Sequence, residues 1–464
     1  MEHGLRKPLP PKPHNAIQMD NFAVLPLLGL VFFVILHRFA SRPVNGRLQT
    51  YSENTWIALG MLLFAYLIPL IALDPRAAAE IVDDGLSQSN LIRVFASSAL
   101  IAYSIYLLKY KSVWTRLLHW PSFFMMLLVL LFMGSTLWSV WPEATLFRSL
   151  ELFAYFTVAL FLATEKNGYQ RIYFLLITVM MSTFILQGGA ILENIAVNGI
   201  YRSALSNQLG LIAASYILLH SYLFPRRMAG YIFGLFAMLA FGSSSTIAAF
   251  MVAVGIFLIF KLSGRRGRLV GFLLSVLGAS AFILSLVDPA RYPFVMNFAV
   301  NVLGREEHHV LGATGRWVLW DVYFQEFRNN WIGGGFWAAE RLFSLELQSF
   351  GVWQAMSAHN GFWSAWIGGG ITAVLLLIGM YFTLFRELAR NAGDQLGLGL
   401  ALTVMLLLNS LTYPGIGGAA STWYFVLALV IALSIRRSVS SQDTCATSRR
   451  CTGPEYVTNM DVQQ

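Results

Sequence analysis

Long apolar runs separated by short polar segments repeat along almost the entire chain of 464 residues. The runs lie near 22–36, 56–73, 91–108, 121–138, 146–163, 171–192, 205–223, 228–242, 244–261, 268–286, 361–385, 395–411 and 417–435. Most approach the roughly 20 residues that an α-helix needs to cross the hydrocarbon core of a bilayer. The pattern therefore predicts an all-α fold, a polytopic membrane helix bundle with 12–13 transmembrane helices.

The composition agrees with a membrane bundle. Hydrophobic residues make up 57% of the chain, charged residues only 12%, and the mean hydropathy is +0.62, whereas a soluble domain carries about 25% charged residues. The net charge of +9 is explained by cations in the loops, so no nucleic-acid partner is expected. Cys445 and Cys451 lie in the C-terminal tail at a spacing that fits no zinc motif, and are interpreted as free cytoplasmic thiols.

Lysine and arginine alternate in number between successive connecting segments. Counted with the run ends, the segments after odd-numbered runs hold 20 of them and those after even-numbered runs hold 7. By the positive-inside rule, the odd-numbered segments face the cytoplasm. The first run, 22–36, conflicts with this topology because Arg6, Lys7 and Lys12 precede it. Either the N-terminus lies outside or this run does not fully cross, so twelve spans are expected and run 22–36 is left open.

Three regions follow from this pattern. They are a polar N-terminal tail over 1–21, the transmembrane bundle over 22–435, and a polar cytoplasmic tail over 436–464. The bundle includes one long loop, 288–358, which this topology makes extracytoplasmic. Long loops without secondary structure are uncommon unless they have a function.

The long loop contains one amphipathic pattern. Four aromatic residues recur at helical spacing with three polar residues opposite: Trp317, Trp320, Phe324 and Phe327, against Asp321, Gln325 and Arg328. Such a helix is suited to lie on the membrane surface. Alternatively, it packs as a lid across the end of the bundle.

The predicted spans hold almost no charge in their interior. Arg93, Arg148, Glu151 and Glu193 lie near span ends. Intramembrane charges are costly and mark ion or substrate pathways, and no paired broken spans are evident in corresponding halves. The sequence therefore argues against a transporter. The glycines at 368–370 are interpreted as small residues that allow close packing of this helix against its neighbours.

Polar residues instead gather in three groups on the predicted extracytoplasmic face. The groups are Arg202 with Asn207, Arg316 with Arg328 and the glycine triplet 333–335, and His359 with Asn360. Each group has a structural alternative, since an arginine can anchor a lipid headgroup, a glycine triplet can form a turn, and an interfacial histidine can simply pack. Their occurrence on one face, around one loop, favours a shared site.

The residue types in these groups suit a diphosphate headgroup on a lipid. Arginine binds phosphate oxygens through two parallel hydrogen bonds, and histidine can accept a proton from a hydroxyl near neutral pH. The lipid tail would lie between spans, and the aromatic helix would cover the headgroup. Neither a metal nor another cofactor is expected, because His308 and His309 beside Glu306 and Glu307 have the wrong spacing for a metal site.

The order and wording of these groups resemble the O-antigen ligase and Wzy-type polysaccharide polymerase superfamily, and most closely its ExoQ-type exopolysaccharide polymerases. The resemblance covers roughly 138–423 and rests on "LWSVWPEATLFRSLELF", "RSALSNQLGLIAA", "TGRWVLW" followed by "NNWIGGGF", and "AHNGFWSAWIGGG", the most specific of the four. The sequence departs at Ser245, where many members have Lys or Arg. It also departs in "LLNSLTYPG", which lacks an acidic residue often found there.

The resemblance implies a metal-independent glycosyltransferase of the bacterial inner membrane that acts at the periplasmic face. Such an enzyme moves a glycan from undecaprenyl diphosphate to an acceptor, and here it would polymerise exopolysaccharide repeat units. A chain-length regulator and a flippase of the same pathway are the candidate partners, besides the bilayer.

The resemblance also implies roles for the polar residues. Arg202 and Arg316 would hold the diphosphate, His359 would activate the acceptor hydroxyl, and Asn360 would orient His359 or the sugar. The expected catalytic residues are His359 and Arg316, and the expected substrate-binding residues are Arg202, Asn207, Arg328 and Asn360.

Other functions stay open from the sequence. A ligase that moves finished glycan to lipid A core or to another acceptor differs from a polymerase only in the acceptor. A transporter of polysaccharide or lipid-linked oligosaccharide would need a polar path through the whole bundle, whereas the polarity is confined to one face. A scaffold would give no reason for the placement of arginine and histidine.

Overall fold

The computed structural model describes residues 55–63, 88–165, 168–198, 206–241, 243–262, 297, 316–349, 359–390, 394–413, 415 and 423–435. The chain divides into two units, Met1–Trp56 and Ile57–Gln464, and every labelled helix belongs to the second. The expected tail boundaries, the apolar runs 22–36 and 268–286, and the His308–His309 pair lie outside the described residues.

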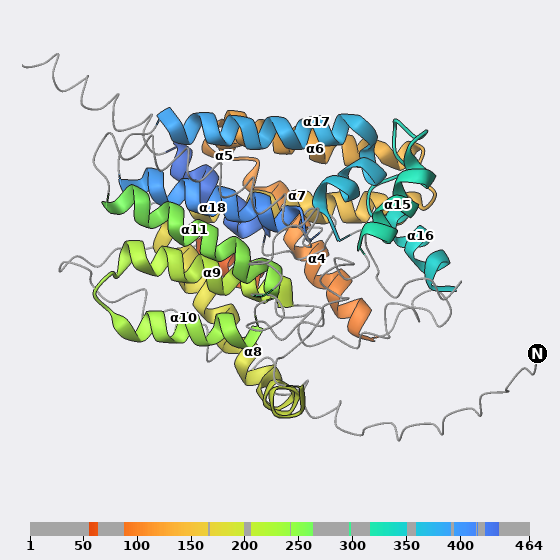
Figure 1. The fold of residues 1–464 in the computed structure, drawn as a ribbon. Coiled ribbons are helices and arrows are strands. Elements are labelled where there is room, and N and C mark those ends of the chain that lie inside the picture. The colour runs from red at the N-terminus through yellow and green to blue at the C-terminus, as the bar shows by residue number, and fades with distance from the viewer. Residues whose placement is uncertain are drawn as a thin grey trace, which may run out of the picture. The chain divides into compact units, whose positions relative to one another are not determined.

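Helices account for all the regular structure in the described residues, which confirms the all-α prediction (Figure 1). The labelled helices are α4 (Gln88–Leu107), α5 (Lys111–Leu117), α6 (Trp120–Gly134) with the short 3-10 helix η3 (Ser135–Leu137), α7 (Pro142–Thr164), α8 (Gly168–Asn198), α9 (Ser206–Leu223), α10 (Met228–Phe241), α11 (Ser244–Leu262), α15 (Arg316–Phe327), α16 (Ala338–Ser349), α17 (Gly361–Arg390) and α18 (Asp394–Ser410). Two further helices cover 55–63 and Trp423–Ile435. Each apolar run within the described residues coincides at least in part with a helix.

Three of the described helices are long and apolar enough to cross a membrane: Trp120–Leu137, Pro142–Thr164 and Gly361–Arg390. Six shorter apolar helices accompany them: Val94–Leu107, Gln208–Leu223, Met228–Ala240, Ser245–Lys261, Gln395–Ser410 and Trp423–Ile435. Large apolar side chains such as Phe95 and Leu239 are 70% and 72% exposed. Because a soluble protein rarely exposes extended apolar surface, these features support the polytopic membrane bundle.

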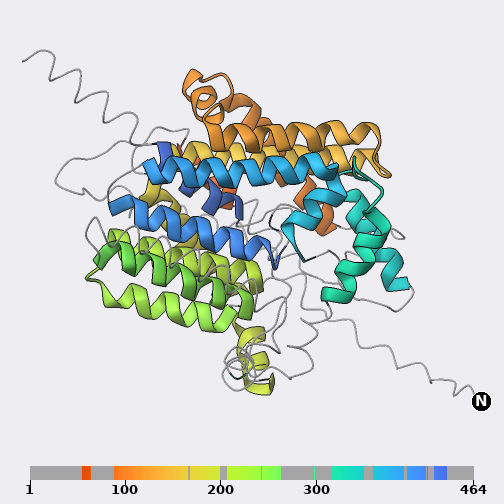
Figure 2. The same ribbon diagram turned by 45° about the horizontal axis from the view of Figure 1, so that its top comes forward.

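α7 lies in the interior of the bundle. All its residues from Leu152 to Ala163 are buried, and it packs against α4, α6 and α8. Pro142 begins the helix at a position where its missing N–H leaves no hydrogen bond unmade. α9 packs against α8, α10, α11 and α18, while α17 packs against α6 and α18 (Figure 2). The segment before α7 reaches the first part of α17 through one loop residue, because the Val140 N–H donates to the Gly334 carbonyl (3.4 Å) and the Gly334 N–H donates to the Ile367 carbonyl (2.8 Å).

α17 is not one continuous helix. Gly369 (φ −136°, ψ 18°) and Gly370 (φ 67°, ψ −163°) leave the helical conformation and separate a short N-terminal part from a long C-terminal part. The close packing predicted for these glycines is present, since a Cβ on Gly368 would lie 3.1 Å from the Phe336 Cα atom. The break adds a backbone role that the packing interpretation did not include. A glycine is required at 370 because other residues rarely adopt a positive φ.

The loop between α15 and α16 fills this break. In a continuous helix, the Ile371 N–H would donate to the Ile367 carbonyl. Here the Ile371 N–H donates to the Trp331 carbonyl (3.1 Å), and the Ile367 carbonyl accepts the Gly334 N–H (2.8 Å). The backbone groups released by the break are therefore satisfied by the loop.

The glycine triplet 333–335 forms the predicted turn and allows this close approach. Gly333 (φ 83°) and Gly335 (φ 104°) adopt left-handed conformations. A Cβ atom on Gly333 would lie only 2.6 Å from the Gly370 nitrogen. The next residue, Phe336, stacks on Phe132 of α6 with ring centroids 4.1 Å apart. The loop is thus held between α17 and α6.

Gly370→Ala is expected to destabilise the protein, because the new Cβ would require a left-handed alanine and would overlap the Trp331 carbonyl. The backbone of Gly370 (φ 67°, ψ −163°) lies in a region essentially restricted to glycine, and holding another residue there costs about 1–3 kcal/mol. We expect a clear fall in the temperature at which detergent-solubilised protein loses its monodisperse peak. Gly255→Ala is the control, since nothing lies within 4 Å of the added atom, and it should be neutral or stabilising. Equal stability of the two variants would contradict the described break.

Candidate functional site

Asn360 fixes the N-terminal end of α17. Its Oδ1 accepts the backbone N–H groups of Phe362 (2.8 Å) and Trp363 (3.2 Å), which is the arrangement of a helix N-cap. Its Nδ2 donates to the Leu411 carbonyl (3.1 Å) in the turn after α18. With a buried side chain and three hydrogen bonds, Asn360 joins the start of α17 to the end of α18.

His359 lies immediately before this cap in an unusual conformation. Its φ of 50° is in the left-handed region, which few residues other than glycine adopt and in which histidine, asparagine and aspartate are enriched. The side chain is half-buried. Since backbone conformations of this kind often occur at functional sites, the geometry is compatible with a residue held in place for chemistry.

The N-terminal ends of three helices form hydrogen bonds with the C-terminal end of α18 and the turn that follows it. Besides the bond from Asn360, the Gln208 Nε2 of α9 donates to the Tyr413 hydroxyl (2.6 Å). The Asn409 Nδ2 donates to the Thr246 hydroxyl of α11 (3.3 Å). The beginnings of α9, α11 and α17, which are distant in sequence, therefore converge at the C-terminal end of α18.

α15 packs on this same region through a hydrophobic cluster. The cluster joins three helices and consists of Leu319, Tyr323 and Phe327 of α15, Ala339 of α16 and Ile367 of α17. The predicted helix in the long loop is therefore confirmed, and its packing favours the lid alternative over a helix lying on the membrane surface.

The packed face of α15 differs from the predicted face. Phe327 is buried as expected, but Phe324 is 44% exposed. Its ring contacts Trp363 and Trp366 of α17 edge-on, at a centroid distance of 6.2 Å in each case. The prediction that Phe324 shares one face with Phe327 is wrong. The buried face is formed by Leu319, Tyr323 and Phe327, which are spaced four residues apart.

Two arginines form a cationic cluster beside this region. Arg148 donates to Glu151 (2.7 Å), whose other oxygen accepts the Ser97 hydroxyl (2.6 Å). The Arg148 guanidinium also lies over the Trp337 ring, 4.8 Å from its centre. Arg341 is only 8% exposed, and burial and the nearby charge of Arg148 lower the pKa of Arg341. The cluster therefore places a second cation, Arg341, near the Arg148–Glu151 ion pair.

From the sequence, Arg148 was only a charge near a span end, and Arg341 was not a candidate. No motif contains Arg341, and the one available signal was the helical period of α16. That helix also buries Glu340, whose Oε1 accepts the Ser364 hydroxyl of α17 (2.9 Å). Polar side chains of α16 thus contact the first part of α17 a few residues after His359.

Three of the remaining predicted residues lie on or beside the elements that meet here. Arg316 begins α15 and Asn207 lies in the first turn of α9, but their side chains are outside the described part of the chain, as is all of Arg202. Arg328 follows α15 and is exposed. The structure thus brings the start of α9, α15 and the His359–Asn360 pair to one end of the bundle, while the roles of these side chains stay predictions.

Residues 229–378 match the family model described as O-antigen ligase. No curated protein shows significant similarity to the chain. The matched range includes Arg316, Arg328, His359 and Asn360, whereas Arg202 and Asn207 precede it. The match covers about a third of the chain of 464 residues, and the bundle of apolar helices is of the kind expected for a membrane protein of this type. The match confirms the resemblance to the O-antigen ligase and Wzy-type superfamily, and the ExoQ subtype stays a prediction.

Asn360→Ala is expected to lower thermal stability, because the N-cap and the bond to Leu411 are both lost. Loss of an N-cap alone costs typically about 1 kcal/mol. Asn360→Ser should recover part of this loss, since a serine hydroxyl can also cap the helix but cannot reach as far as the asparagine amide. Thermal denaturation in detergent measures both variants, and an alanine variant as stable as the wild type would contradict the capping role.

Proposed function

We propose that the protein is a glycosyltransferase of the bacterial inner membrane that polymerises polysaccharide repeat units. The repeat units would be carried on undecaprenyl diphosphate and joined at the periplasmic face, as in exopolysaccharide production. The proposal is carried by one observation: His359 stands at the capped start of α17, inside the segment that matches O-antigen ligase. The cation count of the loops supports the periplasmic orientation of that end.

The proposed reaction needs a base at the acceptor. His359 would take the proton of the acceptor hydroxyl while the hydroxyl oxygen bonds to the anomeric carbon of the donor glycan. The bond from that carbon to the diphosphate oxygen breaks, and the electron pair leaves with the undecaprenyl diphosphate. Without a metal ion in the proposed mechanism, the charge that develops on the leaving group must be stabilised by cations of the protein.

Arginines are the proposed source of that stabilisation. Arg202 and Arg316 would hold the diphosphate and Arg328 would contribute at the exposed end of α15, with Asn207 binding nearby. The Arg148 and Arg341 cluster adds positive potential to the same end of the bundle. Guanidinium groups suit this role because they bind two phosphate oxygens at once and remain charged.

Asn360 takes a narrower role than the sequence suggested. Its carbonyl oxygen and amide nitrogen are both engaged, with α17 and with Leu411. We therefore assign it to positioning His359 through the backbone rather than to binding the sugar.

A ligase is the second candidate, and the description of the matching family favours it. The two reactions share the donor and the chemistry and differ in the acceptor. Purified protein supplied with lipid-linked repeat units alone should produce longer lipid-linked chains if it is a polymerase. Transfer only after addition of lipid A core or another acceptor would establish the ligase.

His359→Gln is expected to abolish transfer while the protein remains folded and abundant. An amide can form hydrogen bonds but cannot accept a proton near neutral pH, and a general base contributes about 10²–10⁴-fold to a rate. Polymer length and membrane abundance should be measured together in cells, with His359→Asn as a second variant, because asparagine also tolerates the left-handed conformation. Polymer of normal length from either variant would overturn the assignment of His359 as the base.

Arg316→Lys is expected to impair transfer although it keeps the charge, because lysine cannot form the two-pronged contact with phosphate. Arg226→Lys, at an exposed position between α9 and α10, is the matched control and should leave activity unchanged. Equal activity of Arg316→Lys and wild type at equal abundance would count against the diphosphate contact.

A further inference from the structure

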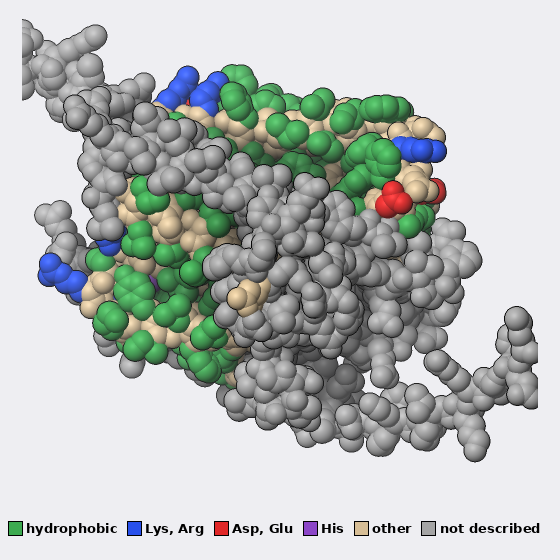
Figure 3. Space-filling model, in the orientation of Figure 1, with side chains coloured by type: hydrophobic (Ala, Val, Ile, Leu, Met, Phe, Trp, Pro, Cys, Tyr) green, Lys and Arg blue, Asp and Glu red, His purple; other side chains and the backbone are tan. Residues whose placement is uncertain are grey.

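One outward face of α17 carries an exposed apolar stripe. Leu375, Ile378 and Phe382 are 59%, 50% and 66% exposed, and their spacing of three and four residues places them on one side of the helix. Continuing by four residues leads to Arg386. Figure 3 shows hydrophobic side chains along the edge where α17 lies, with Lys and Arg side chains at the end away from α15 and α16.

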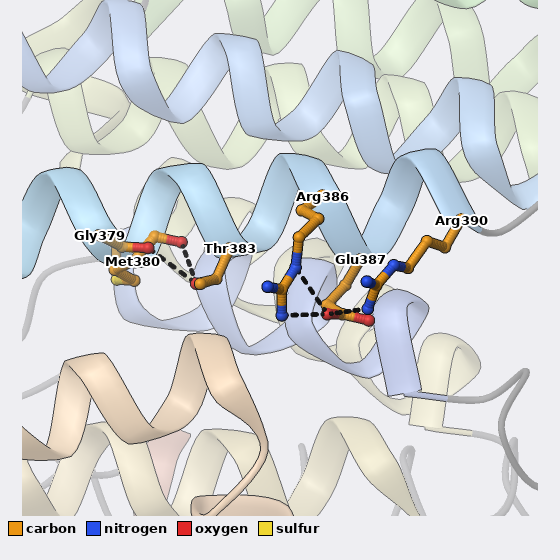
Figure 4. A network of polar contacts seen from close by, with 6 residues as sticks. All are labelled: Gly379, Met380, Thr383, Arg386, Glu387 and Arg390. Atoms are coloured by element: carbon orange, nitrogen blue, oxygen red, sulfur yellow. Dashed lines mark hydrogen bonds and ion pairs between the residues drawn. The ribbon is translucent and has the colours of Figure 1, made fainter.

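Two arginines at the end of this stripe share one carboxylate. The Arg386 Nη2 and Nε atoms lie 2.8 Å and 3.2 Å from the Glu387 Oε1, and the Arg390 Nη1 lies 3.2 Å from the same oxygen (Figure 4). The side chains of Arg386 and Arg390 are 37% and 64% exposed, against 15% for Glu387. The three side chains therefore carry a net positive charge, and the two arginines are more exposed than the glutamate. Guanidinium N–H groups that do not contact Glu387 can bind an anion.

An aromatic side chain completes the surface. The Trp120 ring at the start of α6 is 54% exposed, and the Arg386 guanidinium lies 5.9 Å from its centre. Leu118, just before it, is 63% exposed. Tryptophan is enriched where the polar and apolar parts of a bilayer meet, so this end of α17 lies at headgroup level while the stripe lies at the level of the acyl chains.

We propose that this face of α17 binds an anionic glycerophospholipid of the surrounding bilayer. One acyl chain would lie along Leu375, Ile378 and Phe382, and the phosphate would contact Arg386 and Arg390. Charge decides the occupant, since a zwitterionic headgroup would leave the excess positive charge uncompensated. A second copy of the chain docked here would bury two arginines against an identical cationic surface, which is unfavourable.

The lipid surface is distinct from the candidate active site. His359 precedes the first residue of α17, whereas Arg386 and Arg390 lie in its final turns. The inference does not depend on the proposed glycosyltransferase activity, because it rests only on the shape and charge of this face. A bound lipid here would hold the C-terminal part of α17 against α6, the helix that carries Trp120.

Native mass spectrometry of protein released from vesicles of mixed phosphatidylglycerol and phosphatidylcholine tests the proposal. Wild-type protein should retain phosphatidylglycerol selectively. The double variant Arg386→Gln and Arg390→Gln should lose about tenfold or more of this preference, since a cation near a membrane surface contributes about 1 kcal/mol to anionic lipid binding. Arg226→Gln, which removes an exposed cation elsewhere, should keep it. Equal preference in the double variant and wild type would overturn the proposal.

A second measurement needs no variant. Wild-type protein in vesicles that contain photoreactive phosphatidylglycerol should be labelled on two peptides. One contains Phe382 and the other contains Trp120. Labelling only elsewhere, crosslinked dimers through α17, or displacement of the label by undecaprenyl phosphate at low concentration would each refute the proposal.

Discussion

An exchange of backbone hydrogen bonds between the break in α17 and the loop after α15 supports the rest of the candidate site. A helix interrupted inside a bilayer exposes amide and carbonyl groups, each of which costs several kcal/mol when unsatisfied in hydrocarbon. The Trp331 carbonyl and the Gly334 N–H satisfy those groups. The break is therefore tolerated only because a second segment of the chain is inserted there, and glycines on both sides allow the two backbones to approach.

The exchange turns the first part of α17 into a separate short helix with its own supports. One end is bound to the loop at Gly334, and the other end is capped by Asn360 and tied to Leu411. The hydrophobic cluster with α15 packs against its side at Ile367. His359 therefore stands on an element that is restrained by α15, by the loop that follows α15, and by the turn after α18.

The positions of the helices followed from the sequence, because burial in lipid selects long apolar runs and helices are the structure that satisfies their backbone. The break in α17 could not be predicted from the sequence. A glycine triplet is equally typical of a close-packed helix surface, and the loop segment that fills the break is not evident from the sequence. Phe324 was misplaced because periodicity alone does not say which of two adjacent apolar positions packs. Arg341 was missed because the nearby charge of Arg148 belongs to α7, and the sequence alone does not show that α7 and α16 meet.

The same exchange fixes lengths as well as residue types. The Trp331 carbonyl and the Gly334 N–H are three positions apart, and their partners at Ile367 and Ile371 are four apart. A residue inserted or deleted within either segment would keep one of the two hydrogen bonds and lose the other. A change of length between 331 and 334 would therefore alter how the first part of α17 is held relative to the rest of that helix. The lengths of the two segments are therefore coupled, because a change in one must be matched by a change in the other if both hydrogen bonds are to form.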